Sequence, residues 1–124
     1  MRSITPRRVL SREQQTEITR IIVKVGQLLA QHGAEGRIIE QTTVRLGLAL
    51  GLESVEMAIS ASAIVLTSLY QGSCVTTTRR VREHGINMQV VCEIQRICIM
   101  SEKSLIGARE VRQRLEAITP FHYH

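Results

Sequence analysis

The sequence predicts an α+β domain in which two N-terminal helices precede a three-stranded antiparallel meander and two C-terminal helices follow it. Apolar residues recur at helical spacing in two stretches before residue 51, and the period changes to two between about residues 55 and 80. Helical spacing returns after residue 87. The length of 124 residues suits one domain. The expected order of elements is α-α-β-β-β-α-α.

The first two helices have clear boundary signals. Ser11 has the character of an N-cap, and Gln14 stands three residues later as its capping-box partner, which predicts a helix over 12–32. Gly33 can take the positive φ of a helix end. The second helix is expected to begin near Glu35, whose carboxylate suits a helix N-terminus, and to end at Gly51. Such a short joint places the two helices side by side and antiparallel.

The strand region and the last two helices follow from local pattern. Alternating residues over 55–61, a β-branched run over 64–69 and threonines over 74–80 predict three strands, with tight turns at 61–62 and 70–73. Asn87 is a fair N-cap for the next helix, and Pro120 ends the last one. We expect residues 1–10 to form a flexible tail, 11–119 the single domain, and 120–124 a second tail.

Composition limits the classes of function. Aromatic residues make up 2% of the chain, which argues against base-stacking nucleic-acid modules and requires an aliphatic core. The net charge of +5 is compatible with phosphate, anionic lipid or anionic metabolites, and equally with a solvated surface. Three cysteines without a C-x-x-C pattern indicate buried free thiols in a reducing compartment. Without a signal-peptide core or a run of ~18–20 apolar residues, the chain is expected to be soluble and cytosolic.

Two polar stretches are candidates for chemistry. His32, Glu35 and Glu40 at the helix joint, alone or with His84, could form an acid/base or metal cluster, whereas helix-end electrostatics explains His32 and Glu35 without any ligand. Residues 76–80, three threonines and two arginines, could hold a carboxylate or phosphate, or could line a solvent face and protect a sheet edge. The chain has no phosphate loop, dinucleotide fingerprint or recognisable metal-ligand spacing, so no cofactor is predicted.

Several short motifs follow one another along the chain. They are Gln31-His32-Gly33-Ala34-Glu35, Arg45-Leu46-Gly47, Ala49-Leu50-Gly51, Ser54-Val55-Glu56, Ala63-Ile64-Val65-Leu66-Thr67, Thr78-Arg79 and Gly85-Ile86-Asn87-Met88. In this order they resemble the threonine/serine exporter (ThrE-like) family, from about residue 14 to residue 123, and the resemblance is greatest to its YjjP-type members. Gly36 departs from the pattern, because relatives often have a hydroxyl residue there.

The resemblance implies a cytoplasmic domain of an inner-membrane exporter of small carboxylates or amino acids, such as succinate or threonine and serine. In that family a bundle of transmembrane helices follows the matching region, and this sequence stops where it would begin. The aromatic tail 121–124 would then lie near the membrane interface. The resemblance also implies a YjjB-type membrane subunit as partner, with a gating, assembly or cargo-sensing role for the domain.

These considerations give one set of candidate ligand-binding residues and leave two other classes of protein open. The candidates are His32, Glu35, Glu40, Arg79 and Asn87, with Arg79 pairing a carboxylate and Asn87 equally suited to be a helix cap. A small hydrolase-like enzyme using His32, Glu35 and Glu40 is the main alternative, which requires those side chains to converge. A basic nucleic-acid-binding module is disfavoured by the lack of rings. A homo-oligomer is compatible with each of these functions.

Overall fold

The computed structural model describes residues 9–83 and 85–118 and confirms the predicted order of elements. Helices α1 (Arg12–Gln31) and α2 (Gly36–Ala49) come first. Strands β1 (Ser54–Ile59), β2 (Ala63–Tyr70) and β3 (Ser73–Arg80) form an antiparallel sheet in the order β1-β2-β3. Helices α3 (Met88–Glu102) and α4 (Ala108–Ile118) complete the described chain. Residues 1–8 and 119–124 lie outside it, and with them most of the first predicted tail and all of the second, including Pro120.

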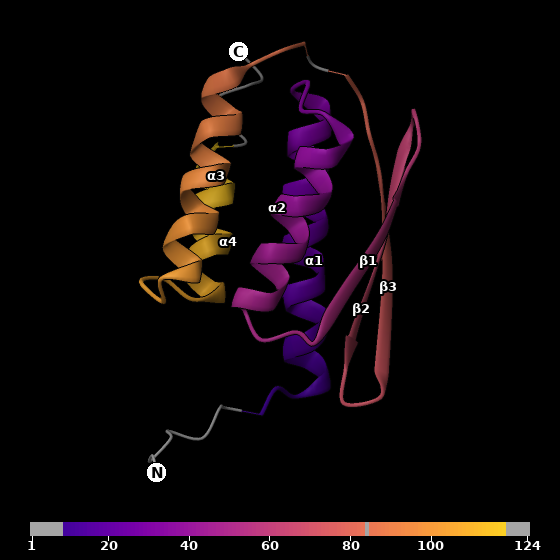
Figure 1. Cartoon of the computed structure of the whole chain (residues 1–124), viewed down its shortest axis with the longest axis vertical. Coiled ribbons are helices and arrows are strands. Elements are labelled where there is room, and N and C mark those ends of the chain that lie inside the picture. The colour runs from indigo at the N-terminus through magenta and orange to yellow at the C-terminus, as the bar shows by residue number, and fades with distance from the viewer. Residues whose placement is uncertain (1–8, 84, 119–124) are drawn as a thin grey trace.

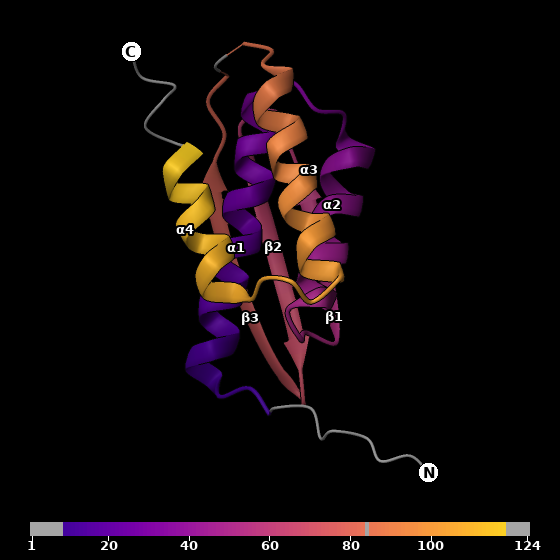
Figure 2. The same ribbon diagram turned by 90° about the vertical axis from the view of Figure 1, so that its left-hand side faces the viewer.

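The elements form three layers (Figures 1 and 2). The sheet lies on one side, α1 and α2 cover one of its faces, and α3 and α4 pack on the far side of those two helices. Helix α1 contacts α2, α3, α4, β2 and β3 and is therefore the centre of the molecule. The fully buried aliphatic side chains come from every layer: Ile22, Val23, Val25, Leu29, Ile64, Leu66, Ile97 and Val111 have no exposed surface.

Most of the predicted boundary signals are present in atomic detail. Ser11 and Gln14 form the reciprocal capping box that begins α1, and Gly33 follows the helix with φ +90°. Gln71 and Gly72 both have positive φ, as a two-residue hairpin turn requires. The Asn87 side chain accepts hydrogen bonds from the backbone N–H of Gln89 and Val90 and caps α3. Each signal lies within a few residues of the backbone group it serves, so the sequence could show it.

The prediction that the cysteines are buried is correct for only one of them. All three thiols are free, but Cys74 and Cys92 are exposed and Cys98 is buried. Cys92 follows two buried residues of α3, Val90 and Val91, and at 100° per residue the next position points away from the core. Cys74 lies on the face of β3 that no helix covers.

A single glycine allows α2 to lie close to the sheet. A Cβ at Gly47 would lie 2.6 Å from Val55 Cγ2 and 3.1 Å from Ile22 Cδ1. We expect Gly47→Ala to lower the free energy of unfolding by about 1–2 kcal/mol, because overpacking outweighs the higher helix propensity of alanine. Urea unfolding of wild type and variant measures this difference.

Gly36→Ala is the matched control for that experiment. Gly36 is the first residue of α2, and a Cβ there would meet nothing within 4 Å. Its stability should equal or slightly exceed that of wild type. A Gly47→Ala variant as stable as the Gly36→Ala variant would show that the close approach of α2 and β1 is not required.

Candidate functional site

The joint between α1 and α2 brings two of the predicted site residues together, His32 and Asn87. The Asn87 backbone N–H donates to the His32 carbonyl over 3.3 Å. His32 is buried, and its Nδ1–H donates to the Leu28 carbonyl over 2.8 Å. Asn87 caps α3, and Ile86 packs so closely that a Cβ at Gly33 would lie 2.9 Å from Ile86 Cγ1. These contacts hold the start of α3 against the joint between α1 and α2.

The two glutamates of the predicted cluster do not join His32 in a buried site. Glu35 is the N-cap residue of α2, is exposed, and makes no side-chain capping bond. Glu40 is exposed on the next turn of α2. His84 lies outside the described residues, and among the described ones no three His, Cys, Asp or Glu side chains are grouped to hold a metal ion. The geometry gives the hydrolase alternative no support.

Arg79 lies elsewhere, in a cleft that none of the other four predicted residues lines. The cleft has a volume of about 210 Å³ and is bounded by α1, β3 and α4, which lie together at one edge of the molecule (Figure 2). Its lining residues are Arg20, Ile21, Lys24, Arg79, Arg112, Leu115 and Glu116. Buried Ile21 and Leu115 give it an apolar floor. Four cations therefore surround a small hollow that contains one carboxylate.

Helical spacing explains how the two helical walls of this cleft arise. Arg20 and Lys24 are four residues apart on α1, so they share one face of the helix, next to the buried Ile21. On α4, Arg112 and Glu116 are also four residues apart and share one face, next to the buried Leu115. Each wall is thus the boundary of an apolar stripe, where charged side chains begin. The cleft forms because two such boundaries meet beside β3.

The charged groups of the cleft differ in their existing partners. Arg112 Nη1 lies 3.3 Å from Glu17 Oε2, and both side chains are about half exposed. Within the described part of the chain, no carboxylate lies within 4.0 Å of Arg20, Lys24 or Arg79. The cations available to a ligand therefore belong mainly to α1 and β3.

The Arg79 guanidinium is held by hydrogen bonds within its own strand and still has N–H groups that a ligand can bind. Nη1 donates to Thr77 Oγ1 over 3.3 Å and to the Thr78 carbonyl over 2.9 Å. Both bonds involve one nitrogen, so the Nε and Nη2 edge keeps the fork of N–H groups that pairs with a carboxylate. The arrangement can hold a small anion with bidentate geometry.

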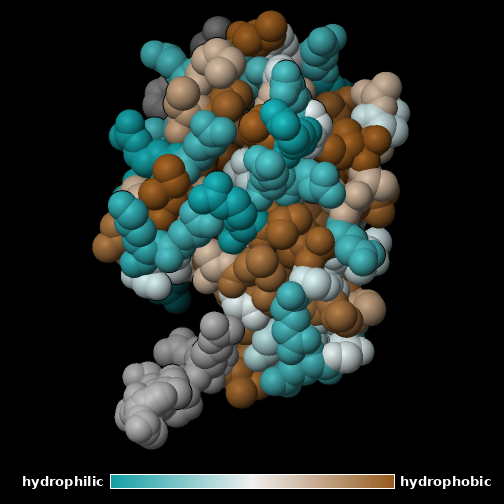
Figure 3. Space-filling model, viewed as in Figure 1, coloured by the Kyte–Doolittle hydropathy of each residue, from teal (hydrophilic) through white to brown (hydrophobic). Residues whose placement is uncertain are grey.

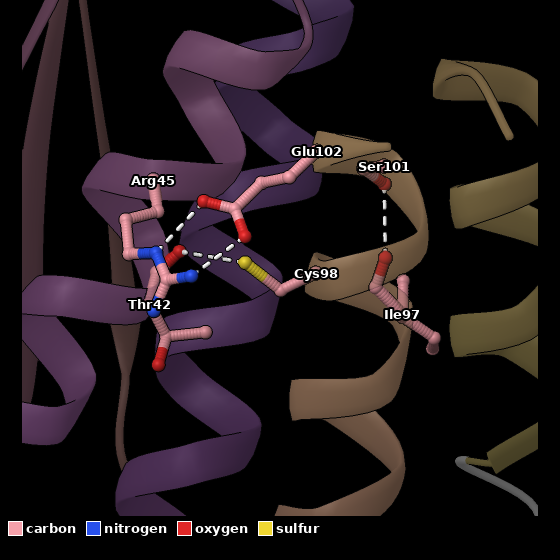
Figure 4. Close-up of polar contacts among 6 residues, drawn as sticks. All are labelled: Thr42, Arg45, Ile97, Cys98, Ser101 and Glu102. Carbon is pink, nitrogen blue, oxygen red and sulfur yellow. Dashed lines mark hydrogen bonds and ion pairs between the residues drawn. The ribbon is translucent and has the colours of Figure 1, made fainter. Parts of the chain in front are cut away.

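A second groove lies between α2 and α3, with a volume of about 270 Å³ (Figure 4). Arg45 spans it and makes a bidentate ion pair with Glu102, with bonds of 2.8 and 2.6 Å. The hydrogen bond to Glu102 raises the pKa of Arg45. Beneath the pair, burial and then Glu102 raise the pKa of Cys98 to about 11. In this groove Glu102 already neutralises Arg45, and the thiol beneath them is unreactive. It therefore has much less capacity for an anion than the cleft between α1, β3 and α4.

Sequence reasoning found Arg79 and missed the residues that face it. Arg112 belongs to one of the basic groups visible in the sequence, but nothing local indicates that it faces residue 79. Arg20, Lys24 and Glu116 look like ordinary charged positions of amphipathic helices. Only the packing of α4 and β3 on α1 brings them together.

The comparisons with known proteins establish the family. A family model described as "Putative threonine/serine exporter" matches residues 20–124. Proteins of Klebsiella aerogenes and Escherichia coli, each named "Probable succinate transporter subunit YjjP", are 45% identical over 112 and 111 residues, and each match covers 90% of this chain. A Haemophilus influenzae protein is 43% identical over 115 residues, or 93% of this chain. No solved structure matches.

These matches define a transporter-related protein, and the chain belongs to the threonine/serine exporter family, as its motifs indicated. It spans 43% of the length of the Klebsiella and Escherichia relatives and 39% of the Haemophilus one. None of the described helices combines the length and hydropathy that crossing a membrane requires.

Thiol chemistry should report the packing of α3 on α2. In folded protein at about pH 8, Cys74 and Cys92 should react rapidly with a maleimide, whereas Cys98 should react only after unfolding, because it is buried and protonated. Mass spectrometry of peptides from timed samples measures this. A Cys98→Ala control should lose only the slow reaction, and equal rates at all three thiols would contradict the packing.

The same burial predicts a pH dependence of stability. The pKa of the Cys98 thiol rises from 9.0 to about 11 in the folded chain, so the folded state favours the protonated form. Its contribution to stability is complete below about pH 9 and is lost as the pH rises toward 11. Wild type should therefore lose more stability than Cys98→Ala over that range in urea titrations. Equal losses would contradict the burial of the thiol.

Proposed function

We propose that this chain forms the cytoplasmic domain of an exporter of small carboxylates or amino acids and holds such a cargo in the α1–β3–α4 cleft. The role is cargo sensing coupled to gating or assembly. Family membership supports transport, and two relatives are named probable succinate transporter subunits. The observation that carries the ligand assignment is the set of four cations, including Arg79, around an apolar floor.

The size and lining of the cleft suit small carboxylates. A volume of about 210 Å³ is below the range of ~300–1,000 Å³ typical of drug-sized ligands. Succinate joins its two carboxylates through two methylenes, which would rest on Ile21 and Leu115 while the carboxylates meet the surrounding cations. Threonine offers one carboxylate and a short side chain for the same surfaces. Arg79 would form the bidentate pair, because its free edge matches a carboxylate.

A ligand in this cleft would link α4 more firmly to α1 and would join it to β3, with which it shares little packing. Helix α4 has two buried residues, Val111 and Leu115, and it contacts α1 and α3. A bound anion would add contacts from Arg112 of α4 to the α1 and β3 walls. Ligand binding would therefore stabilise the packed position of α4, and this change is the proposed gating signal.

We further propose that the domain works at the cytoplasmic face of the inner membrane with a YjjB-type membrane subunit. The relatives named as subunits support a partner protein. The net charge of +5 favours proximity to an anionic leaflet. On the face that Figure 3 shows, hydrophobic residues gather toward the lower middle of the view, with hydrophilic residues above and around them.

Isothermal titration with succinate and with threonine tests the cleft directly. Arg79→Gln should weaken binding of each ligand about tenfold, because it removes a charged bidentate hydrogen bond. Arg80→Gln removes the same charge from the neighbouring residue, which is exposed on the opposite face of β3 and does not line the cleft. This control should bind nearly as well as wild type.

Two results would count against the proposal. Equal weakening by the two substitutions would show that the ligands respond only to net charge. The absence of heat for both ligands at millimolar concentration, in folded wild-type protein, would rule out cargo sensing by this domain.

A further inference from the structure

The charges of the α1–β3–α4 cleft are unevenly distributed between its walls. Arg20, Lys24 and Arg79 stand on α1 and β3, without a carboxylate within 4.0 Å among the described residues. On α4, Arg112 is already paired with Glu17, which does not line the cleft. The remaining charged group of the α4 wall is Glu116. The cleft is thus positive on two walls and has an acidic group on the third.

Glu116 also lacks the partner that would neutralise it. Its carboxylate lies within 4.0 Å of no cation in the described part of the chain, whereas Glu17, Glu102 and Glu110 are all paired. It stands one helical turn beyond Arg112 and beside the buried Leu115 of the cleft floor. An acidic group in this place affects any ligand that occupies the hollow.

A hollow with this charge distribution distinguishes between carboxylates. A zwitterionic amino acid can place its carboxylate at the cationic walls and its ammonium group at Glu116. A dicarboxylate placed in the same way brings its second negative charge toward Glu116 as well as toward the cations, and like charges at close range oppose binding. The discrimination needs no change in the shape of the cleft.

We propose that Glu116 is the specificity-determining residue of the cleft, which accepts the ammonium group of an amino acid and disfavours a second carboxylate. This inference rests on the proposed function, because it concerns the same cleft. It concerns the choice among cargo molecules rather than whether the domain binds them.

The test is a set of isothermal titrations with three ligands, each of which carries a carboxylate on a short chain. Threonine adds an ammonium group, succinate adds a second carboxylate, and butyrate adds neither. Glu116→Gln keeps the size of the side chain and removes its charge. It should tighten succinate binding and weaken threonine binding, each about threefold, as expected for a partly exposed charge pair. Butyrate should change least.

Glu110→Gln is the matched control, because it makes the same change in net charge on the same helix. Glu110 pairs with Arg114 and does not line the cleft. Its effect on the ratio of the succinate and threonine dissociation constants should be small. Because that ratio compares two ligands on one sample, a partial loss of folded protein does not alter it.

The outcomes separate the two proposals. If wild type binds but Glu116→Gln shifts all three ligands as Glu110→Gln does, Glu116 acts only through net charge and the specificity inference is wrong. If wild type binds none of the three ligands at millimolar concentration, the proposed function itself fails. A ratio that changes about tenfold in Glu116→Gln alone supports both.

Discussion

The position of β3 along α1 is the constraint on which the rest of the cleft depends. Gln15 Nε2 donates to the Ser73 carbonyl at the start of β3, over 2.8 Å, and Gln27 Nε2 donates to the Arg80 carbonyl at its end, over 2.7 Å. At ~1.5 Å per helical residue and ~3.3 Å per strand residue, the two spans are about 18 and 23 Å. Helix and strand therefore run alongside each other, which places Arg79 beside Arg20 and Lys24.

A buried polar network strengthens the first of these attachments. Ser68 on β2 lies 2.7 Å from Thr19 Oγ1 and accepts a 3.2 Å hydrogen bond from Gln15. Breaking the hydrogen bonds of buried polar groups costs free energy, so a shift of α1 along the sheet would be strongly disfavoured. The contacts of His32 and Asn87 hold the opposite end of α1. Within this fixed frame α4 packs with few buried side chains, and it carries the acidic wall of the cleft.

The sequence predicted what local chemistry determines and missed what depends on packing between distant segments. The capping box at Ser11, the turn at Gly72 and the cap at Asn87 are local, and the structure has them all. Arg79 could be singled out because threonines and arginines cluster in its strand. Its neighbours in the cleft could not, since Arg20 and Glu116 are nearly a hundred residues apart and no short-range pattern links them.

The most direct measurement is a titration of ¹⁵N-labelled protein with succinate, followed by NMR chemical shifts. Binding in the cleft should shift backbone signals of Arg20 and Lys24, of Arg79, and of Arg112 and Glu116, together with arginine Nε–H signals. The signals of His32 and Asn87 should move little. Shifts centred on the α1–α2 joint, or the absence of any shift at millimolar succinate, would contradict the assignment of the cleft as the cargo site.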